Sequence, residues 1–134
     1  MFRNVYRNKK VLITGHTGFK GSWLSYLLDS VGAILTGYSL PPKTKPSLFN
    51  SLTFSNNLTS IIGDIRDKEK FKTSIKNSNP EFIFHLAAQP LVLESYKNPK
   101  DTFEINFMGT LNLLEALKEL SLPVQVVFIT TDKE

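Results

Sequence analysis

Apolar residues follow two different periods along this chain, and the two periods alternate. Short runs rich in β-branched residues predict five buried strands, over residues 9–15, 33–39, 58–64, 81–88 and 124–131. Apolar residues three or four apart predict helices over residues 18–31, 66–78 and 98–120. The stretch 47–57 is ambiguous and fits one helical turn. Strands that alternate with helices predict the α/β class, with a doubly wound parallel sheet of strand order 3-2-1-4-5 and ligands at the carboxyl ends of its strands.

The longest helix candidate, 98–120, is apolar on two sides. Asn98 is suited to cap it, and Pro99 to take its first position. One stripe consists of Phe103, Phe107, Leu111, Leu114 and Leu117. The second stripe consists of Ile105, Met108, Leu113, Ala116 and Leu120. A helix with two apolar faces meets two partners, so we expect the sheet on one side and a second copy of the chain, in a homodimer, on the other.

Composition narrows the class of protein. The 134 residues are 41% hydrophobic and 21% charged, as in one soluble globular domain. Cysteine is absent and the two histidines, His16 and His85, lie far apart in sequence, which argues against disulfide frameworks and metal centres. The net charge of +4 is scattered rather than gathered in a stripe, so we expect no nucleic-acid partner. The amino-terminal residues lack a long apolar stretch, so we expect no signal peptide, no membrane anchor and a cytoplasmic location.

The first strand runs into "TGHTGFKGSW", where Gly15, Gly18 and Gly21 are spaced three apart. Between a strand and a helix, such glycines serve a tight turn, a close approach of backbone to a pyrophosphate, and close packing of helix on strand. The pyrophosphate then faces the N–H groups at the helix start. A mononucleotide P-loop needs a lysine directly after its last glycine, whereas Lys20 precedes Gly21. The motif therefore predicts a dinucleotide site, and a glycine-rich turn that serves packing alone is the alternative.

The second strand lacks the acid that usually holds the adenosine ribose of a dinucleotide. No Asp or Glu occurs from residue 30 to residue 63. Ser39 and Thr44 offer hydroxyls for a ribose, and the lysines of "PPKTK" offer charge for a 2′-phosphate, so the residues leave both NAD and NADP open. Asp64 follows the third strand and could accept a hydrogen bond from the adenine amino group or cap the next helix.

Six segments together resemble the extended short-chain dehydrogenase/reductase superfamily: "TGHTGFKGSW", "GYSLPP", "GDIRD", "FHLAAQPLV", "NFMGTLNLLEA" and "TTDK". The glycine motif and "HLAA" are common to that superfamily. "GHTGFKGSW", the "PP" after the second strand and the closing "DK" resemble more narrowly the amino-terminal part of the CDP-glucose 4,6-dehydratase family. The resemblance extends from about Lys9 to the end of the chain.

This resemblance implies tightly held NAD and a sugar-nucleotide substrate, CDP-glucose. The C4 hydroxyl of the sugar would be oxidised, water lost across C5 and C6, and the hydride returned to C6, as in an NAD-dependent hydro-lyase. Cofactor contacts would come from the pyrophosphate loop, from the residues after the third strand and from the lining after the fourth strand. With the hydroxyl after the second strand, the candidate cofactor residues are Thr14, Gly15, Thr17, Gly18, Phe19, Gly21, Ser39, Asp64, Ile65, Ala87, Ala88 and Gln89.

The resemblance assigns catalysis to the end of the fifth strand. Thr131 matches the hydroxyl that bonds the C4 oxygen of the sugar, and Asp132 matches the acid that protonates the departing C6 hydroxyl. Lys133 stands where relatives place a glutamate base. A lysine beside Asp132 favours the ionised carboxylate, which opposes the role of acid. Without the resemblance, these residues fit a solvated polar strand end.

The superfamily also uses a Tyr-x-x-x-Lys pair beyond the fifth strand, and the sequence closes at Glu134 before that position. We therefore expect residues 1–134 to form an incomplete NAD(P)-binding Rossmann domain, truncated after the fifth strand, without the later strands and the substrate domain. This chain alone is expected to be inactive as a dehydratase. Two alternatives stay open: a related NAD-dependent sugar-nucleotide epimerase or reductase, and a non-catalytic nucleotide-binding module.

Overall fold

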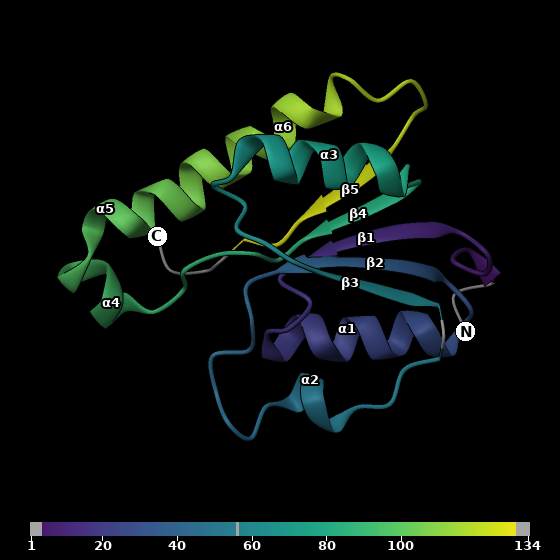
Figure 1. The fold of residues 1–134 in the computed structure, drawn as a ribbon, viewed down its shortest axis with the longest axis horizontal. Helices are drawn as coiled ribbons and strands as arrows, with labels where there is room; N and C mark the ends of the chain where they lie inside the picture. Colours follow the sequence, from purple (N-terminus) through teal and green to yellow (C-terminus); the bar gives the residue numbers. More distant parts are fainter. Residues whose placement is uncertain (1–3, 56, 131–134) are drawn as a thin grey trace.

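The computed structural model describes residues 4–55 and 57–130. Five parallel strands form one sheet in the order β3-β2-β1-β4-β5, which confirms the predicted fold class and strand order (Figure 1). The strands are β1 (Lys10–Thr14), β2 (Ile34–Ser39), β3 (Leu58–Ile62), β4 (Phe82–His85) and β5 (Gln125–Phe128). β1 is central, and the winding reverses between β1 and β4, with Thr14 opposite His85. The loops after these two strands therefore lie side by side at the carboxyl edge.

Helices cover both faces of the sheet (Figure 1). α1 (Phe19–Ser30) and the single turn α2 (Leu48–Ser51) lie on one side, and α3 (Lys68–Ser78) and α6 (Gly109–Leu117) lie on the other. α4 (Val92–Lys97) and α5 (Pro99–Phe103) project beyond the carboxyl ends of the strands. The ambiguous stretch 47–57 contains one helical turn, α2, and the Ser47 hydroxyl caps it.

The hydrophobic core has two parts, one on each face. Alternate residues of β1 point to opposite faces, so Val11 and Ile13 pack on the α1 side and Leu12 packs on the α3 side. The α1-side cluster also contains Leu28, Ala33 and Leu35. The α3-side cluster also contains Tyr38, Ile65, Phe71, Ile75, Ile83, Leu113 and Ala116. Burial on both faces explains why the central strands are almost continuously apolar.

α1 packs on the sheet through small residues. Its buried positions are Gly21, Ser22, Ser25 and Leu28. Trp23 falls on the apolar spacing of the sequence, but its side chain is 50% exposed. A glycine and two serines let the helix approach the sheet closely, which leaves the bulky Trp23 turned outward. Gly32, with a φ of +82°, ends the segment in the left-handed conformation.

The predicted helix 98–120 consists of consecutive segments rather than one regular helix. α5 passes into a π-helical segment, η2 (Glu104–Met108), which passes into α6. Pro99 takes the first helical position as expected. Asn98 makes no side-chain cap with its oxygen, and its amide nitrogen donates to the Glu94 carboxylate. The wider π turn changes the angular phase of the residues around it.

The two apolar stripes of this region separate into an inner and an outer one. Leu113 and Ala116 are buried. Packed against the core are Ile105, Leu117 and Leu120. Exposed are Phe103, Phe107, Met108, Leu111 and Leu114. Met108 and Leu117 thus change sides relative to the predicted stripes, since the π segment shifts the helical phase, and the expected second copy on the outer stripe stays a prediction.

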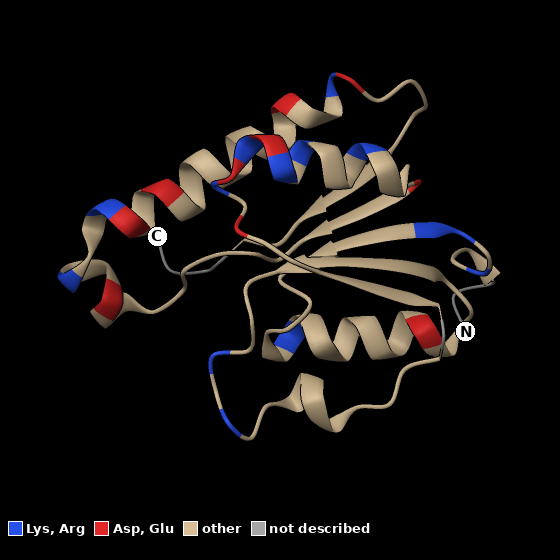
Figure 2. Ribbon diagram, viewed as in Figure 1, with Lys and Arg blue, Asp and Glu red and all other residues tan. Residues whose placement is uncertain are grey.

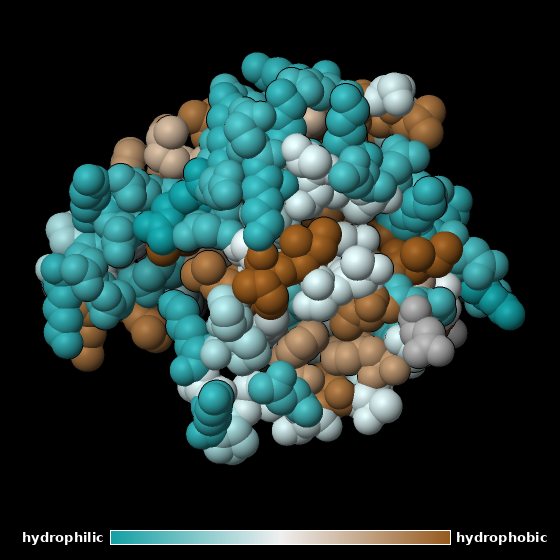
Figure 3. Space-filling view, in the orientation of Figure 1, coloured by the Kyte–Doolittle hydropathy of each residue, from teal (hydrophilic) through white to brown (hydrophobic). Residues whose placement is uncertain are grey.

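Charged and apolar residues are distributed unevenly over the surface. Charged residues are frequent on α3 and α5 and sparse on α1, α2 and α6 (Figure 2). The space-filling view shows polar atoms over α3 and apolar atoms around α1 and α2 (Figure 3). In the described part of the chain, no helix combines the length and apolar character needed to cross a membrane. Within the same residues, no group of three or more His, Asp or Glu side chains is arranged to hold a metal ion.

Candidate functional site

The turn between β1 and α1 is built around the glycines. Gly15 has a φ of +77°, a left-handed conformation that favours glycine. A Cβ on Gly21 would lie 2.0 Å from the Gly15 carbonyl oxygen, and a Cβ on Gly15 would lie 3.0 Å from the Ala87 nitrogen. Gly18 is less crowded, since its Cβ would lie 3.3 Å from the Gly15 oxygen. The turn therefore closes tightly on itself and against the loop after β4.

α1 begins directly after this turn. Gly18 is its N-cap without a side-chain cap, and no acidic residue lies in its first turn. The N–H groups and the positive end of the helix dipole therefore face the carboxyl edge of the sheet without a carboxylate from that turn to neutralise them. A helix start of this kind is suited to bind an anion such as a phosphate. Phe19, the first helical residue, is 72% exposed.

A pair of hydroxyls joins the glycine turn to the end of β2. The Thr17 hydroxyl donates to the Leu40 carbonyl at 2.7 Å, and the Ser39 hydroxyl lies 2.8 Å from Thr17 Oγ1. Because the Thr17 proton is directed to Leu40, Ser39 is the donor within the pair. Ser39 is partly exposed. A hydroxyl thus stands where dinucleotide folds usually place an acid for the ribose.

The Thr14 side chain is directed at the end of the neighbouring strand β4 rather than at solvent. It is fully buried, and its Oγ1 accepts from the N–H groups of Leu86 and Ala87, both at 3.1 Å. With both lone pairs used, its hydroxyl donates to His85 Nδ1 at 2.8 Å. His85 Nε2 then carries the ring proton and lies 3.4 Å from the Thr110 hydroxyl. Burial lowers the pKa of His85 to about 4, so this chain of hydrogen bonds runs through a neutral ring.

Gln89 ties the loop after β4 to the helical segments that follow it. Its side chain is buried, and its amide donates to the Leu91 carbonyl and to Thr102 Oγ1, both at 3.0 Å. Its side-chain oxygen accepts from the Leu91 N–H at 2.7 Å. Asn106 of the π segment accepts from the Gln89 N–H at 2.8 Å and donates to the Gln89 carbonyl at 3.1 Å. The polar groups of Gln89 are thus engaged within the chain.

His16 lies within the glycine turn, and its side chain packs into the fold. From the sequence alone, it was given no role in the site. It is fully buried, with Nε2 2.6 Å from the Ser60 hydroxyl and its ring edge-on to Phe49, the centroids 5.1 Å apart. A Cβ on Gly37 would lie 2.3 Å from the imidazole. Burial lowers the pKa of His16 to about 4. The sequence signal for this packing was a glycine in the interior of a strand, which marks a close approach.

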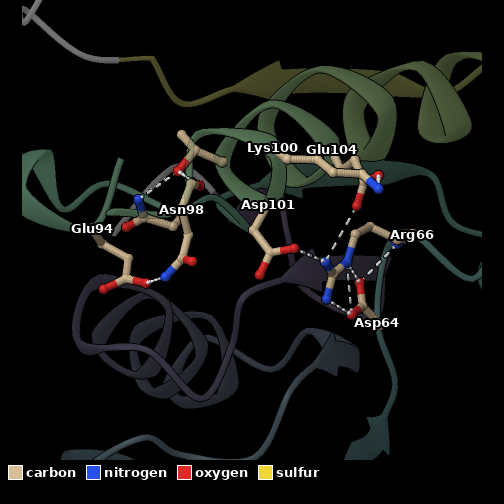
Figure 4. Close-up of polar contacts among 9 residues, drawn as sticks. Asp64, Arg66, Glu94, Asn98, Lys100, Asp101 and Glu104 are labelled. Atoms are coloured by element: carbon tan, nitrogen blue, oxygen red, sulfur yellow. Dashed lines mark hydrogen bonds and ion pairs between the residues drawn. The ribbon is translucent and has the colours of Figure 1, made fainter. Parts of the chain in front are cut away.

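At the end of β3, Asp64 is paired with Arg66 (Figure 4). The guanidinium contacts both carboxylate oxygens, with Nη2 2.7 Å from Oδ2. Burial alone would raise the pKa of Asp64, but hydrogen bonds from the side chain and backbone of Arg66 outweigh it and hold that pKa below its usual value. Asp64 is therefore an acceptor at neutral pH. The cap of α3 is Asp67, whose carboxylate accepts from the Lys70 N–H at 3.1 Å, so Asp64 is not that cap.

The predicted cofactor residues share one edge of the sheet, but their side chains do not all face outward. Ile65 is 5% exposed, packs in the core, and accepts from the Asn112 amide at its carbonyl at 2.9 Å. Ala87 is half-buried and Ala88 is exposed. Buried residues of the set can meet a ligand only through their main chain. The buried residues hold the backbone at the carboxyl ends of the strands, whereas the exposed residues form the surface there.

Outside the described residues lie the predicted catalytic Thr131, Asp132 and Lys133. The Tyr-x-x-x-Lys spacing does occur earlier in the chain, at Tyr6–Lys10 and at Tyr96–Lys100. Tyr6 packs against the α1-side core cluster, and Lys10 is the first residue of β1. Tyr96 lies on α4 and is 82% exposed. Neither pair follows β5, so neither is the pair that the resemblance places there.

A parallel sheet of this order, with a glycine turn and a helix start at the switch between β1 and β4, defines a Rossmann-type α/β protein. A family model described as GDP-mannose 4,6 dehydratase matches residues 12–133, and the chain belongs to this family.

Individual relatives confirm the resemblance that the motifs indicated. The chain is 50% identical over 131 residues to the CDP-glucose 4,6-dehydratase of Salmonella typhimurium, covering 98% of this chain and 36% of the relative. It is similar to the solved epimerase Mth375 from Methanothermobacter thermautotrophicus, with a TM-score of 0.83, 29% identity and coverage of 96% and 37%. It is also similar to the Thermus thermophilus UDP-glucose 4-epimerase in complex with NAD, with a TM-score of 0.76, 30% identity and coverage of 90% and 37%. The chain thus spans little more than a third of the length of these relatives.

Proposed function

We propose that this chain is the NAD-binding part of a sugar-nucleotide 4,6-dehydratase that acts on CDP-glucose. The observation that carries the proposal is the turn of Gly15, Gly18 and Gly21 at the start of α1, located at the switch between β1 and β4. The 50% identity to a CDP-glucose 4,6-dehydratase supports the substrate. The NAD complex of an epimerase with the same fold supports the cofactor.

The phosphate side of the site fits a dinucleotide. Backbone already fills the space that a Cβ would need at Gly15 and Gly21, so bare main chain leads into the helix start. In the proposed complex, Thr17 and Phe19 direct their N–H groups at the pyrophosphate, and the helix dipole favours its negative charge. The Gly18 N–H instead donates to the Gly15 carbonyl at 3.1 Å and closes the turn. The N–H groups of Thr17 and Phe19 bind the cofactor without a charged side chain.

The adenosine side is proposed to use Ser39 for the ribose and Asp64 for the 6-amino group of adenine. Ile65 contributes main chain only, because its side chain is buried. Lys43 and Lys45 are exposed in the loop after β2 and are suited to a 2′-phosphate. NADP is therefore the alternative cofactor, and affinity measurements decide between the two.

The nicotinamide side is proposed to be lined by Ala87 and Ala88, whose small side chains leave room for a flat ring and a sugar. Gln89 and Thr14 hold this lining in place from behind through the hydrogen bonds described above. Bound NAD would supply the acceptor for the hydride from C4 of the sugar and the donor of that hydride to C6. This chain would supply the nicotinamide side of the pocket in which these atoms meet.

Proton chemistry is assigned to the residues that follow β5. Phe128 pairs with His85, and the Ile129 N–H donates to the His85 carbonyl at 3.1 Å, so the chain leaves β5 at the carboxyl edge. In the proposed mechanism Thr131 bonds the C4 oxygen and Asp132 protonates the departing C6 hydroxyl. Lys133 stands where relatives have a glutamate base, so in the proposed mechanism its neutral amine would take the C5 proton.

A related epimerase is the second candidate, favoured by the similarity to two epimerase structures. An acid directly after Thr131 suits elimination better than epimerisation, which favours the dehydratase. Mass spectrometry of the product that the full-length protein forms from CDP-glucose separates the two. A product lighter by one water supports the dehydratase, whereas an isomer of unchanged mass supports the epimerase.

The cofactor proposal is tested by calorimetry of this chain with NAD and with NADP. We expect NAD to bind more tightly, and we expect no steady conversion of CDP-glucose by the 134-residue chain alone. Failure of both dinucleotides to bind contradicts the cofactor proposal and favours a non-catalytic module.

A homodimer through residues 98–120 is also proposed. Phe103 and Phe107 stack with centroids 4.9 Å apart and an interplanar angle of 19°, and both side chains are more than half exposed. With Leu111 and Leu114 they form a continuous outer stripe of the kind that a second copy covers. Light scattering tests this, with Phe107→Glu as the dissociating variant. A monomer at micromolar concentration of the unmodified chain contradicts it.

A further inference from the structure

Arg66 lies among three carboxylates from two parts of the chain (Figure 4). Toward the end of β3, its backbone N–H donates to Asp64 Oδ1 at 2.9 Å, its Nε lies 3.0 Å from Oδ2, and its Nη2 lies 2.7 Å from Oδ2. Toward the following helix, its Nη1 lies 3.3 Å from Asp101 Oδ1 and 3.8 Å from Glu104 Oε2. One guanidinium thus joins the end of β3 to α5 and η2.

This arrangement fixes the orientation of Asp64. A guanidinium fork is planar and holds a carboxylate in one plane, with both of its oxygens engaged. The main chain of Asp64 is held as well, because the hydroxyl of Tyr38 donates to its carbonyl at 3.0 Å. The Asp64 side chain nevertheless keeps 27% of its surface exposed. One side of an oriented carboxylate is therefore open to a ligand at the carboxyl edge.

We propose that Arg66 is a positioning residue for base recognition, which orients the Asp64 carboxylate to accept a hydrogen bond from the 6-amino group of adenine. The inference rests on the proposed function, which places adenine beside Asp64. Arg66 itself does not contact the base. Asp101 and Glu104 hold the far side of its guanidinium, which keeps the fork aligned. A residue that only tied β3 to α5 would matter equally for every dinucleotide.

The test compares NAD with nicotinamide hypoxanthine dinucleotide, which carries a 6-oxo group in place of the 6-amino group. Calorimetry on the unmodified chain is expected to show about tenfold tighter binding of NAD, the value of one hydrogen bond to a charged acceptor. Arg66→Gln should weaken NAD binding about fivefold and leave the Kd of the hypoxanthine analogue within about twofold. Arg66→Lys, which keeps the charge without the fork, should lie between the two.

Two further variants keep the test decisive. Asp64→Asn replaces the acceptor by a side chain that can also donate, so its preference for NAD should vanish, and adding Arg66→Gln to it should change neither affinity. Asp101→Asn leaves Arg66 in place and should cause a smaller loss, again confined to NAD. Circular dichroism melting shows whether each variant is folded, and if Arg66→Gln does not fold, Asp101→Asn and Arg66→Lys supply the same readout.

The outcomes separate the inference from the function on which it rests. An NAD-selective loss in the Arg66 variants supports the positioning role. Equal losses for both dinucleotides, or no loss, overturn that role while the dinucleotide site stands. Equal affinity of the unmodified chain for both dinucleotides overturns the role of Asp64, and the inference with it. Binding of neither dinucleotide overturns the proposed function itself.

Discussion

Two loops meet at the carboxyl edge of the sheet, and they are shaped in opposite ways. The turn after β1 depends on the absence of side chains, since a Cβ at Gly21 would lie 2.0 Å from a carbonyl oxygen. The loop after β4 depends on buried polar side chains, since Thr14 and Gln89 bond its backbone from both sides. The first loop is bare where an anion would bind, whereas the second is rigid behind a lining of alanines. In the proposed site, binding and support are thus divided between the two loops.

The largest effect is expected in the glycine turn. Gly21→Ala places a methyl group against backbone that cannot move away without opening the turn, so the free energy of unfolding should fall by about 3 kcal/mol or more. Gly18→Ala is the matched control, because its Cβ would lie 3.3 Å from the nearest atom and its φ of −74° suits any residue. Urea unfolding of both variants measures the difference. Equal losses would contradict the proposed shape of the turn.

Acidification should weaken both loops, because each rests on a buried neutral histidine. His16 and His85 have folded pKa values of about 4, below their ordinary 6.5, so the unfolded chain binds more protons between these values. Stability is therefore complete above about pH 6.5 and falls toward pH 4, by up to roughly 3 kcal/mol for each histidine.

The pH dependence can be divided between the two loops. Replacing either His16 or His85 by glutamine should remove about half of the slope of unfolding free energy against pH between 6.5 and 4.5. Denaturant unfolding at a series of pH values measures the slope. A slope that neither replacement changes would show that other groups cause the acid sensitivity.

A smaller loss is expected at the junction of the two loops. Thr14→Val keeps the shape of the side chain but leaves the Ala87 N–H without its acceptor, which should cost about 2 kcal/mol, whereas the Leu86 N–H keeps the Thr14 carbonyl at 3.2 Å. Thr14→Ser keeps the hydroxyl and loses only a methyl group, at about 1 kcal/mol. If serine destabilises the chain more than valine, packing rather than hydrogen bonding dominates at this position.

The smallest effect is expected away from both loops. Lys68 of α3 pairs with Glu115 of α6, and Lys72 of α3 pairs with Glu119, just beyond α6, both at 2.5 Å. These side chains are 31–51% exposed and lie in contact with water, so Lys68→Ala and Lys72→Ala should each leave the midpoint of thermal unfolding nearly unchanged. Thermal unfolding in low and high salt checks this. Losses as large as that of Thr14→Val would contradict the view that stability of this region depends on the core.

Local patterns in the sequence were sufficient for the fold and for the glycine turn after the first strand. Periodicity predicts the strands, and Gly15 with its two partners marks the turn because its chemistry is contained in a few neighbouring residues. Three other features depend on contacts between distant segments: the packing of His16 on Gly37, the hydrogen bonds of Gln89 to Thr102 and Asn106, and the ion pair of Arg66 with Asp101. The π segment at 104–108 likewise depends on how its flanking helices pack, which spacing alone does not determine.

The most direct test of the central claim, that the carboxyl edge of this sheet binds a nicotinamide dinucleotide, is titration of the isotope-labelled chain with NAD followed by amide NMR shifts. We predict that the largest shifts occur at residues 15–21, at Ser39, at Asp64 and Ile65, and at Ala87 and Ala88. The amides of Lys10 and Ile34, at the opposite edge, should not shift. Shifts at the opposite edge, or none at saturating NAD, would contradict the account.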